Sequence, residues 1–325
     1  YGLAGNDALG ERFPYRSIVA MGEESGFYYN WNSQGKGPKI TTYGNPNATW
    51  EEAKKLDVGL ELGLFNALNI EAAYFTEDRT GIFMRRTSLP SSTGLLGVTP
   101  YGNIGRVKSH GVDLSAVYNK QFNKDWSLSL RGTFTFSRNE VVEKDEGDLM
   151  YDYMSVVGHP VNAITGVLVA DGLFTSQEEI DNSPKQQFGN YTVGDIKYRD
   201  LNGDGIVDGN DVTTAGSPTV PEIQYGIGAT VKWRRLDFSF MFQGASNVSL
   251  RMYNMHPFCD ASHFGYGITQ YIADNHWSED NNRADAAYPR LTSQLSSNNT
   301  QSSTFYIHDA KYLRLKTVEL GYTIK

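Results

Sequence analysis

The sequence predicts an all-β protein, and more narrowly a segment of an antiparallel β-barrel that spans a membrane. Strands of about ten residues alternate apolar and polar side chains, which is the period of an extended chain with two different faces. Short turns alternate with long loops along the chain, as they do in outer-membrane barrels. The 325 residues include 20 Tyr, 16 Phe and 33 Gly, a composition that favours strands and turns.

The first clear pair of strands covers residues 56–65 and 68–76. In the first strand the leucines and Val58 fall on one face, while Asp57, Gly59, Glu61 and Gly63 fall on the other. The second strand repeats the pattern after a short connection, which predicts a hairpin. Upstream, residues 17–21 and 26–31 are weak strand candidates in an irregular region, and residues 35–50 are expected to form a loop rich in Gly, Pro and Asn.

Two further hairpins and a last strand follow the same pattern. Residues 110–118 pair with residues 126–137, and residues 223–233 pair with residues 236–243 across a connection of two arginines. Residues 311–324 form the last alternating segment. Aromatic residues near the strand ends fit interfacial girdles, with ordinary strand packing as the alternative: Tyr118, Trp126, Trp233 and Tyr322.

The connections that follow each hairpin are long. They cover residues 81–105, 139–221 and 247–309, and the second contains a possible short helix at residues 176–180. Loops of this length in a compact domain are usually functional. On the barrel interpretation the long loops are extracellular, and the polar faces of the strands, including Asp57, Glu61, Asp113 and Arg131, face the lumen, where they solvate the interior or meet a plug.

Residues 200–211 carry the sharpest motif in the chain. Oxygen ligands fall at positions 1, 3, 5, 7, 9 and 12 of a calcium loop, with Gly205 at position 6 where the chain must turn sharply. The predicted ligands are Asp200, Asn202, Asp204, the carbonyl of Ile206, Asp208 and Asp211. Ca²⁺ is therefore the expected cofactor. Asp replaces the usual Glu at the last position and no helices flank the loop, so an EF-hand pair is not expected, and an Asx- and Gly-rich turn without metal is the alternative.

Several functional classes are excluded or disfavoured. The formal charge of −8 argues against nucleic-acid binding, and Cys259, the single cysteine, rules out an internal disulfide. His256, Cys259 and His263 lack an evident fourth ligand for zinc. No catalytic motif is present, so an enzyme is not expected. No apolar run is long enough for a membrane-spanning helix, and no signal peptide opens the chain.

The residues alone also allow a second interpretation, in which the protein belongs to a different functional class. A secreted, calcium-stabilised β-sandwich or adhesin would also alternate, but its strands are usually nearer five or six residues and its apolar faces must meet each other.

Short segments spread along nearly the whole chain, in order, resemble the barrel of the SusC/RagA family of TonB-dependent transporters. The run TWEEAKKLDVG at residues 49–59 and the run NIGRVKSHGVD at residues 103–113 carry much of this resemblance. The remaining segments are residues 158–161, 170–174, 200–211, 277–281, 288–291 and 310–316.

The resemblance implies a barrel of about 22 strands with a plugged lumen. It also implies active import across the outer membrane of a Gram-negative bacterium, with oligosaccharide or peptide as cargo. A SusD-like surface lipoprotein would act as a lid, TonB with ExbB and ExbD would supply the energy, and outer-membrane lipid would surround the wall. Residues 1–325 then correspond to the later part of the barrel, without the signal peptide, the plug and the last strands.

Candidate cargo-binding residues lie on the long loops. Aromatic faces stack on sugar rings, and arginines donate hydrogen bonds to sugars or peptides. The candidates are Tyr29, Trp31, Arg85, Arg86, Tyr253, Tyr266 and Trp277, with Tyr28 and Phe264 beside them. The alternative is that these side chains pack one loop against another or touch the lid.

Overall fold

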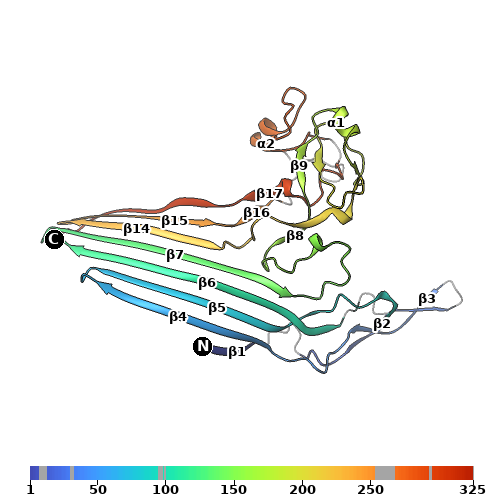
Figure 1. Cartoon of the computed structure of the whole chain (residues 1–325), viewed down its shortest axis with the longest axis horizontal. Helices are drawn as coiled ribbons and strands as arrows, with labels where there is room; N and C mark the ends of the chain where they lie inside the picture. The colour runs from blue at the N-terminus through green and yellow to red at the C-terminus, as the bar shows by residue number, and fades with distance from the viewer. Residues whose placement is uncertain are drawn as a thin grey trace.

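The computed structural model describes residues 1–6, 13–29, 33–93, 98, 100–252, 268–292 and 295–324. Its body is one curved, antiparallel sheet of eight strands in the order β1-β4-β5-β6-β7-β14-β15-β18 (Figure 1). The strands are β1 (Gly2–Asn6), β4 (Glu51–Leu64), β5 (Leu68–Arg85), β6 (Tyr101–Gln121), β7 (Trp126–Glu143), β14 (Ile223–Trp233), β15 (Leu236–Ser246) and β18 (Tyr312–Tyr322). The sheet is open, because β1 and β18 each have one neighbour among the described strands.

Three short turns lie at the same end of this sheet (Figure 1). The turn between β4 and β5 uses left-handed backbone at Phe65 (φ 55°) and Asn66 (φ 50°). The two-residue turn between β14 and β15 does the same at Arg234 (φ 54°). Positive φ gives the turn a twist that matches the flanking strands. The predicted hairpins are therefore confirmed, and all the long connections leave from the opposite end.

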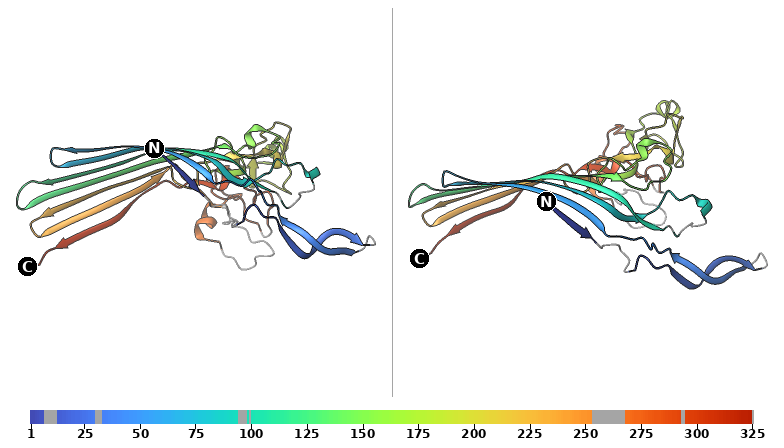
Figure 2. Two further views of the ribbon diagram at one scale, coloured as in Figure 1. Left: turned by 90° about the horizontal axis from the view of Figure 1, so that it is seen from below. Right: turned by 60° about the horizontal axis from the view of Figure 1, so that its bottom comes forward.

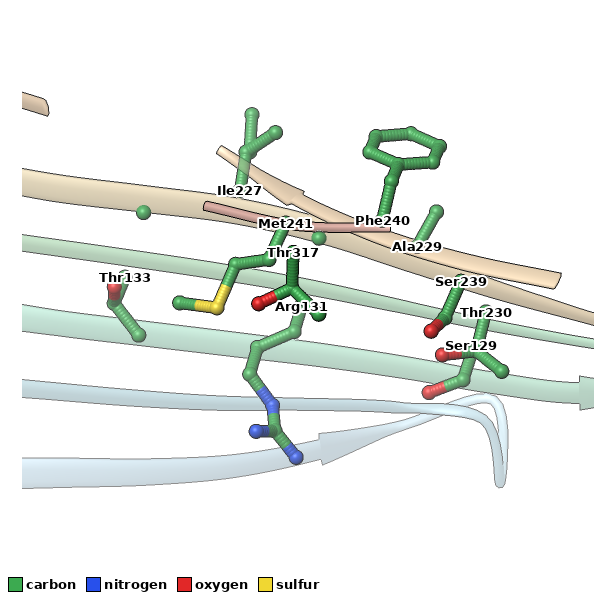
Figure 3. A pocket seen from close by; sticks show the side chains of 12 residues that line it. Ser129, Arg131, Thr133, Ile227, Ala229, Thr230, Ser239, Phe240, Met241 and Thr317 are labelled. Carbon is green, nitrogen blue, oxygen red and sulfur yellow. The ribbon is translucent and has the colours of Figure 1, made fainter. Parts of the chain in front are cut away.

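The two faces of the sheet differ as the alternation predicts. On the face that we call the outer face, apolar side chains are exposed to an unusual degree: Leu60 is 56% and Ile227 62% accessible. Figure 3 shows Ile227, Ala229 and Phe240 projecting from this face, while Arg131, Thr133 and Met241 project from the other, which we call the inner face. In the described part of the chain no second sheet packs on the outer face, which argues against a β-sandwich. Lipid is the solvent that suits such a face.

The apolar band on the outer face has a defined height. At the turn end Trp126 lies opposite Trp233, with ring centroids 5.8 Å apart. From Leu64 to Leu56 the chain takes eight steps, which at ~3.3 Å per residue and a tilt of ~40° span about 20 Å, close to the ~25 Å of an outer-membrane band. Beyond it the outer face becomes charged, and Arg106 pairs with Asp78 at 2.7 Å.

The strands run further past this band than the sequence indicated. β5 continues to Arg85 and β6 begins at Tyr101, so the loop predicted at residues 81–105 is strand at both of its ends. Register shifts near Arg79, Ile82 and Arg106 interrupt the alternation, which explains why the pattern could not be followed there. The loop predicted at residues 35–50 is also wrong in part, because β3 (Ser33–Thr42) pairs with a single strand β2 (Ile18–Tyr29) in a projecting hairpin.

The two longest connections fold together into what we call the outer module, residues 144–222 and 268–311 (Figures 1 and 2). The predicted helix is confirmed as α1 (Gln177–Asp181), whose N-cap Ser176 accepts a hydrogen bond from the Glu179 amide. The other helix and strands of the module are α2 (Gln270–Asn275), β8 (Ile164–Leu168), β9 (Ala170–Leu173), β10 (Lys185–Gln186), β11 (Ile196–Tyr198), β12 (Ile206–Val207), β13 (Val212–Ala215) and β17 (Ile307–Asp309). Strand β16 (Ser249–Arg251) pairs with β17. The module has 3₁₀ turns at Asp152–Met154, Gly209–Asp211 and Thr304–Tyr306, and a further 3₁₀ turn lies between β5 and β6 at Ser91–Thr93. Among the described residues no helix has the length and apolar character needed to cross a membrane.

Substitution of Leu60 by Arg tests which face of the eight-stranded sheet, which we call the wall, lies against lipid. Because Leu60 is central in the apolar band, an arginine there should destabilise the folded barrel by about 2–4 kcal/mol. The matched control is Glu61→Arg on the inner face, which should have little effect. Urea unfolding of the full-length protein in lipid vesicles, followed by the heat-sensitive gel shift of folded barrels, measures both. Equal destabilisation by the two variants would contradict the orientation.

Candidate functional site

The inner face carries polar groups that have few partners among the described residues. Glu61 on β4 lies directly opposite Glu71 on β5. Asp113 on β6 accepts a hydrogen bond from Thr135 Oγ1 at 2.8 Å. Arg131 projects from the same face beside a shallow cavity of about 230 Å³ (Figure 3). The predicted lumen-facing residues therefore do share one face, and that face suits water or polar material rather than lipid.

At the end of the inner face that lies opposite the three short turns, which we call the outer end, charged side chains of both signs form a network. Arg79 pairs with Glu77 at 2.9 Å and with Glu51 at 3.4 Å, and Lys55 pairs with Glu77 at 3.1 Å. Glu51 is nearly buried and also accepts a hydrogen bond from Asn6 Nδ2 at 3.0 Å. This network was not predicted from the sequence, although Glu77 and Arg79 are two residues apart on one strand and therefore share a face. Beside it the inner face and residues 144–165 border a cavity of about 510 Å³.

The outer module has its own hydrophobic core. Its buried members include Leu168, Leu173, Ile196, Tyr198, Val207, Ala286 and Tyr306. Trp277 belongs to this core, has 7% of its surface exposed, and donates from its indole nitrogen to Asn282 Oδ1 at 3.0 Å. Its ring lies so close to Gly194 that a Cβ there would be 2.2 Å from the ring. The expectation that Trp277 offers a stacking face to cargo is therefore corrected: its faces are covered by packing.

Buried amides join the two long connections inside this module. Gln186 donates to the Ile196 carbonyl at 3.0 Å and to Asn298 Oδ1 at 2.7 Å, and accepts from the Tyr198 amide at 2.6 Å. Asn299 accepts from the Ile196 amide at 2.9 Å and donates to Asp195 Oδ1 at 2.7 Å. These residues are fully buried, so unsatisfied partners would be costly. The network replaces the regular hydrogen-bond ladder that irregular loops lack.

Two phenols extend the same network. The Tyr198 hydroxyl donates to the Asn298 carbonyl at 2.7 Å, and the Tyr306 hydroxyl donates to the Asn299 carbonyl at 2.6 Å. Burial raises the pKa of Tyr198 well above its usual value, and burial also raises the pKa of Tyr306. The cause is the cost of placing a phenolate in a nonpolar interior.

The predicted calcium loop is a compact turn with its carboxylates directed inward to backbone amides. The Asp200 carboxylate accepts from the amides of Gly203 and Gly205 at 2.6 and 2.8 Å. Asp211 is fully buried and accepts from the amides of Leu201 and Asp208 at 2.7 and 2.8 Å. Among the described residues, no three His, Cys, Asp or Glu side chains are gathered as a metal site would require. The oxygen-only donor set suits Ca²⁺, and binding stays a prediction.

The other cargo candidates divide by what the structure describes. Arg85 and Arg86 are exposed at the outer end of β5, and Arg85 Nε donates to the Tyr101 hydroxyl at 3.0 Å. The side chains of Tyr28 and Tyr29, and the whole of Trp31, Tyr253, Phe264 and Tyr266, lie outside the described residues, as do the three residues of the zinc alternative. The structure brings none of the described candidates together, since Arg85 and Arg86 lie on the wall and Trp277 in the outer module.

Comparison with known proteins agrees with this geometry. The family model described as "TonB dependent receptor-like, beta-barrel" matches residues 9–246. The chain belongs to the TonB-dependent receptor family. Proteins of this family reside in the outer membrane, so lipid covers the outer face of the receptor's wall.

Curated relatives of this receptor chain are also TonB-dependent receptors. TonB-dependent receptor P26 of Formosa agariphila is 30% identical over 100% of the chain and 32% of its own length. TonB-dependent receptor SusC of Bacteroides thetaiotaomicron is 22% identical over 100% of the chain and 31% of its own length. The chain therefore spans about a third of the length of the curated relatives it matches.

A solved structure shares the fold. The structure of the RagAB peptide transporter superposes with a TM-score of 0.67 at 21% identity, covering 98% of this chain and 33% of the other. The resemblance to the SusC/RagA family is thus confirmed for the fold of the receptor's wall.

The buried phenols predict alkaline opening of the outer module. Their folded pKa values lie above the unfolded value of about 10, so the stability they contribute is complete below about pH 10 and is lost as the pH rises towards the folded values. We expect protease resistance of the module to persist at about pH 9 and to disappear at higher pH together with tyrosine ionisation. Tyrosine absorbance at 295 nm and limited proteolysis, compared with the Tyr198→Phe and Tyr306→Phe variants, measure this. Titration of both phenols near pH 10 in a still-resistant module would contradict it.

Proposed function

We propose that this chain forms part of the wall of an outer-membrane importer that takes up oligosaccharides or peptides, is energised through TonB with ExbB and ExbD, and works with a SusD-like surface lipoprotein. The observation that carries the proposal is a two-faced wall of the TonB-dependent receptor family whose outer end bears a large folded module. A diffusion pore needs a polar lumen but no such module.

The arrangement of the outer elements supports a lid and a cargo. The outer module and the β2–β3 hairpin both extend beyond the apolar band, on the side where cargo arrives and where a surface lipoprotein would dock (Figure 2). One related structure supports peptide as a cargo class, because RagAB is a peptide transporter. The exposed Arg85 and Arg86 at the wall's outer end suit hydrogen bonding to either cargo.

Dependence on TonB tests the import proposal. In cells that produce the full-length protein, loss of TonB should reduce uptake of labelled peptide or oligosaccharide to the background of passive leak, because a plugged barrel needs energy to open. The amount of transporter in the outer membrane should stay unchanged, and uptake of a small sugar that diffuses through porins serves as the control. Uptake that continues undiminished without TonB would overturn the proposal.

We also propose that residues 200–211 bind Ca²⁺ and that the ion orders the outer module rather than taking part in transport. All six predicted ligands are oxygens, the preference of a hard cation. The loop is tied to the module, because Tyr153 donates to the Asn210 carbonyl at 2.6 Å and Thr213 donates to the Tyr153 carbonyl at 2.7 Å.

A chelator experiment separates calcium binding from turn stability. In the wild-type protein, millimolar Ca²⁺ should slow proteolysis of residues 139–221 by about tenfold relative to chelator, because a ligand that binds only the folded state stabilises it. Asp200→Ala with Asp204→Ala should be cleaved quickly with or without Ca²⁺, whereas Asp181→Ala, on the exposed side of α1, should respond like the wild type. A wild-type protein indifferent to chelator would refute calcium binding.

A further inference from the structure

The cavity of about 510 Å³ lies on the inner face, at the outer end of the wall. Ile82, Met84 and Val107 contribute its floor from β5 and β6, and Val156, Pro160 and Val161 contribute its roof from the start of the outer module. The floor residue Val107 pairs with Val141 and lies opposite Arg79, which shares the inner face with Glu71. The cavity therefore opens towards the lumen and not towards lipid.

The roof is held in place by hydrogen bonds to the wall. The Val141 amide donates to the His159 carbonyl at 2.9 Å, and the Gly158 amide donates to the Val141 carbonyl at 2.8 Å. The Val161 amide donates to Asn139 Oδ1 at 2.7 Å. On the floor, a Cβ at Gly105 would lie 2.9 Å from Met84 Sδ, so glycine at this position allows the floor side chains to lie flat. The cavity is thus preformed, and its volume falls in the usual ligand-site range of ~300–1,000 Å³.

The lining distinguishes between the two cargo classes. Most of the described side chains that line the cavity are apolar, and none of these described side chains is aromatic. Sugar binding relies on flat aromatic faces and on dense hydrogen bonding to hydroxyl groups. A branched aliphatic side chain needs only an apolar, shape-matched space. The cavity therefore matches a leucine-like side chain better than a sugar ring.

The rim supplies the polar groups that a peptide main chain requires. Arg79 lies on one side, held by Glu51 and Glu77. Lys144 lies on the other side, next to Glu143, whose carboxylate pairs with Arg106 at 3.4 Å. Lys144 is exposed and forms no ion pair with the described residues. A peptide has carbonyl acceptors and amide donors on either side of each side chain, so a charged rim around an apolar cavity suits it.

We propose that this cavity is a subsite for an aliphatic side chain of a peptide cargo. The proposal rests on the import function proposed above and deepens it, because it selects peptide over oligosaccharide. Lys144 binds a main-chain carbonyl or the terminal carboxylate of the peptide, and the roof residues cover the aliphatic side chain.

Binding of matched probes to the full-length transporter with its partner lipoprotein tests this. The probes are a fluorescent heptapeptide of Gly and Ser with Leu at its centre, the same peptide with Ser at its centre, and a labelled glucan of similar length. The Leu peptide should bind about tenfold more tightly than the Ser peptide, since a hydrophobic pocket discriminates on this scale. Val161→Trp, which fills the cavity, and Val161→Asp, which places a charge in it, should each remove this preference. Val157→Asp, at the neighbouring exposed residue outside the lining, is the matched control and should retain it.

Each other outcome overturns the subsite. One such outcome is peptide binding with no preference for Leu, and another is a preference that the Val157 and Val161 substitutions reduce equally. Either would show that the cavity does not bind the side chain of the central residue. Loss of folded transporter in both Val161 variants, with Leu and Ser peptides bound equally by the wild type, would indicate that the protein's own plug fills the cavity. Tight binding of the glucan alone would overturn the subsite and leave import intact, whereas failure to bind or import either class would count against the import proposal as well.

Discussion

The rest of this structure depends on the ladder of backbone hydrogen bonds that joins neighbouring strands across the sheet. In hydrocarbon an unpaired amide or carbonyl costs several kcal/mol, so only structures that pair every backbone group can cross a membrane. The register from β4 to β18 is continuous through the apolar band, with one register shift between Met241 and Phe242. Within the apolar band the two free edges of the described sheet belong to β4, because β1 pairs only with residues 51–55, and to β18. Neither edge suits hydrocarbon, for the same reason.

The ladder also explains the separation of side chains. Once the register is fixed, a period of two leaves no choice about which residues face lipid. Glu61 and Glu71 are then forced opposite each other on the inner face, where water or a polar partner can solvate them. Two carboxylates directly opposite each other on neighbouring strands destabilise a sheet when they are not solvated. Their presence is a further reason to regard the inner face as wet or covered by polar groups.

Prediction from the sequence succeeded where the period of two was uninterrupted. β14 was predicted to the residue. The first short connection, predicted at residues 66–67, was correct to within one residue, because the turn also includes Phe65. Prediction failed beyond the band, where bulges near Arg79 and Arg106 break the period and the strands are longer than the pattern indicates. It also failed for Trp277, because an aromatic residue in a long loop gives no local sign of whether a distant segment, here Gly194, will cover it. The buried Gln186 and Asn299 could not be found either, since amides are typical of exposed loops and only the fold brings them together.

The segment from residue 144 to residue 165 connects these parts physically. It is hydrogen-bonded to β7 through Val141 and Asn139, and it is bonded to the loop of residues 200–211 through Tyr153 and Asn210. A displacement of that loop would therefore be transmitted to the roof of the inner cavity, because Tyr153 and Val156 are within one turn of chain. Stacking of Tyr151 on Tyr153, with ring centroids 5.2 Å apart, stiffens the same segment. The outer module and the cavity are thus connected through one short stretch of chain. We therefore expect a loss of stability in the module to alter the shape of the cavity.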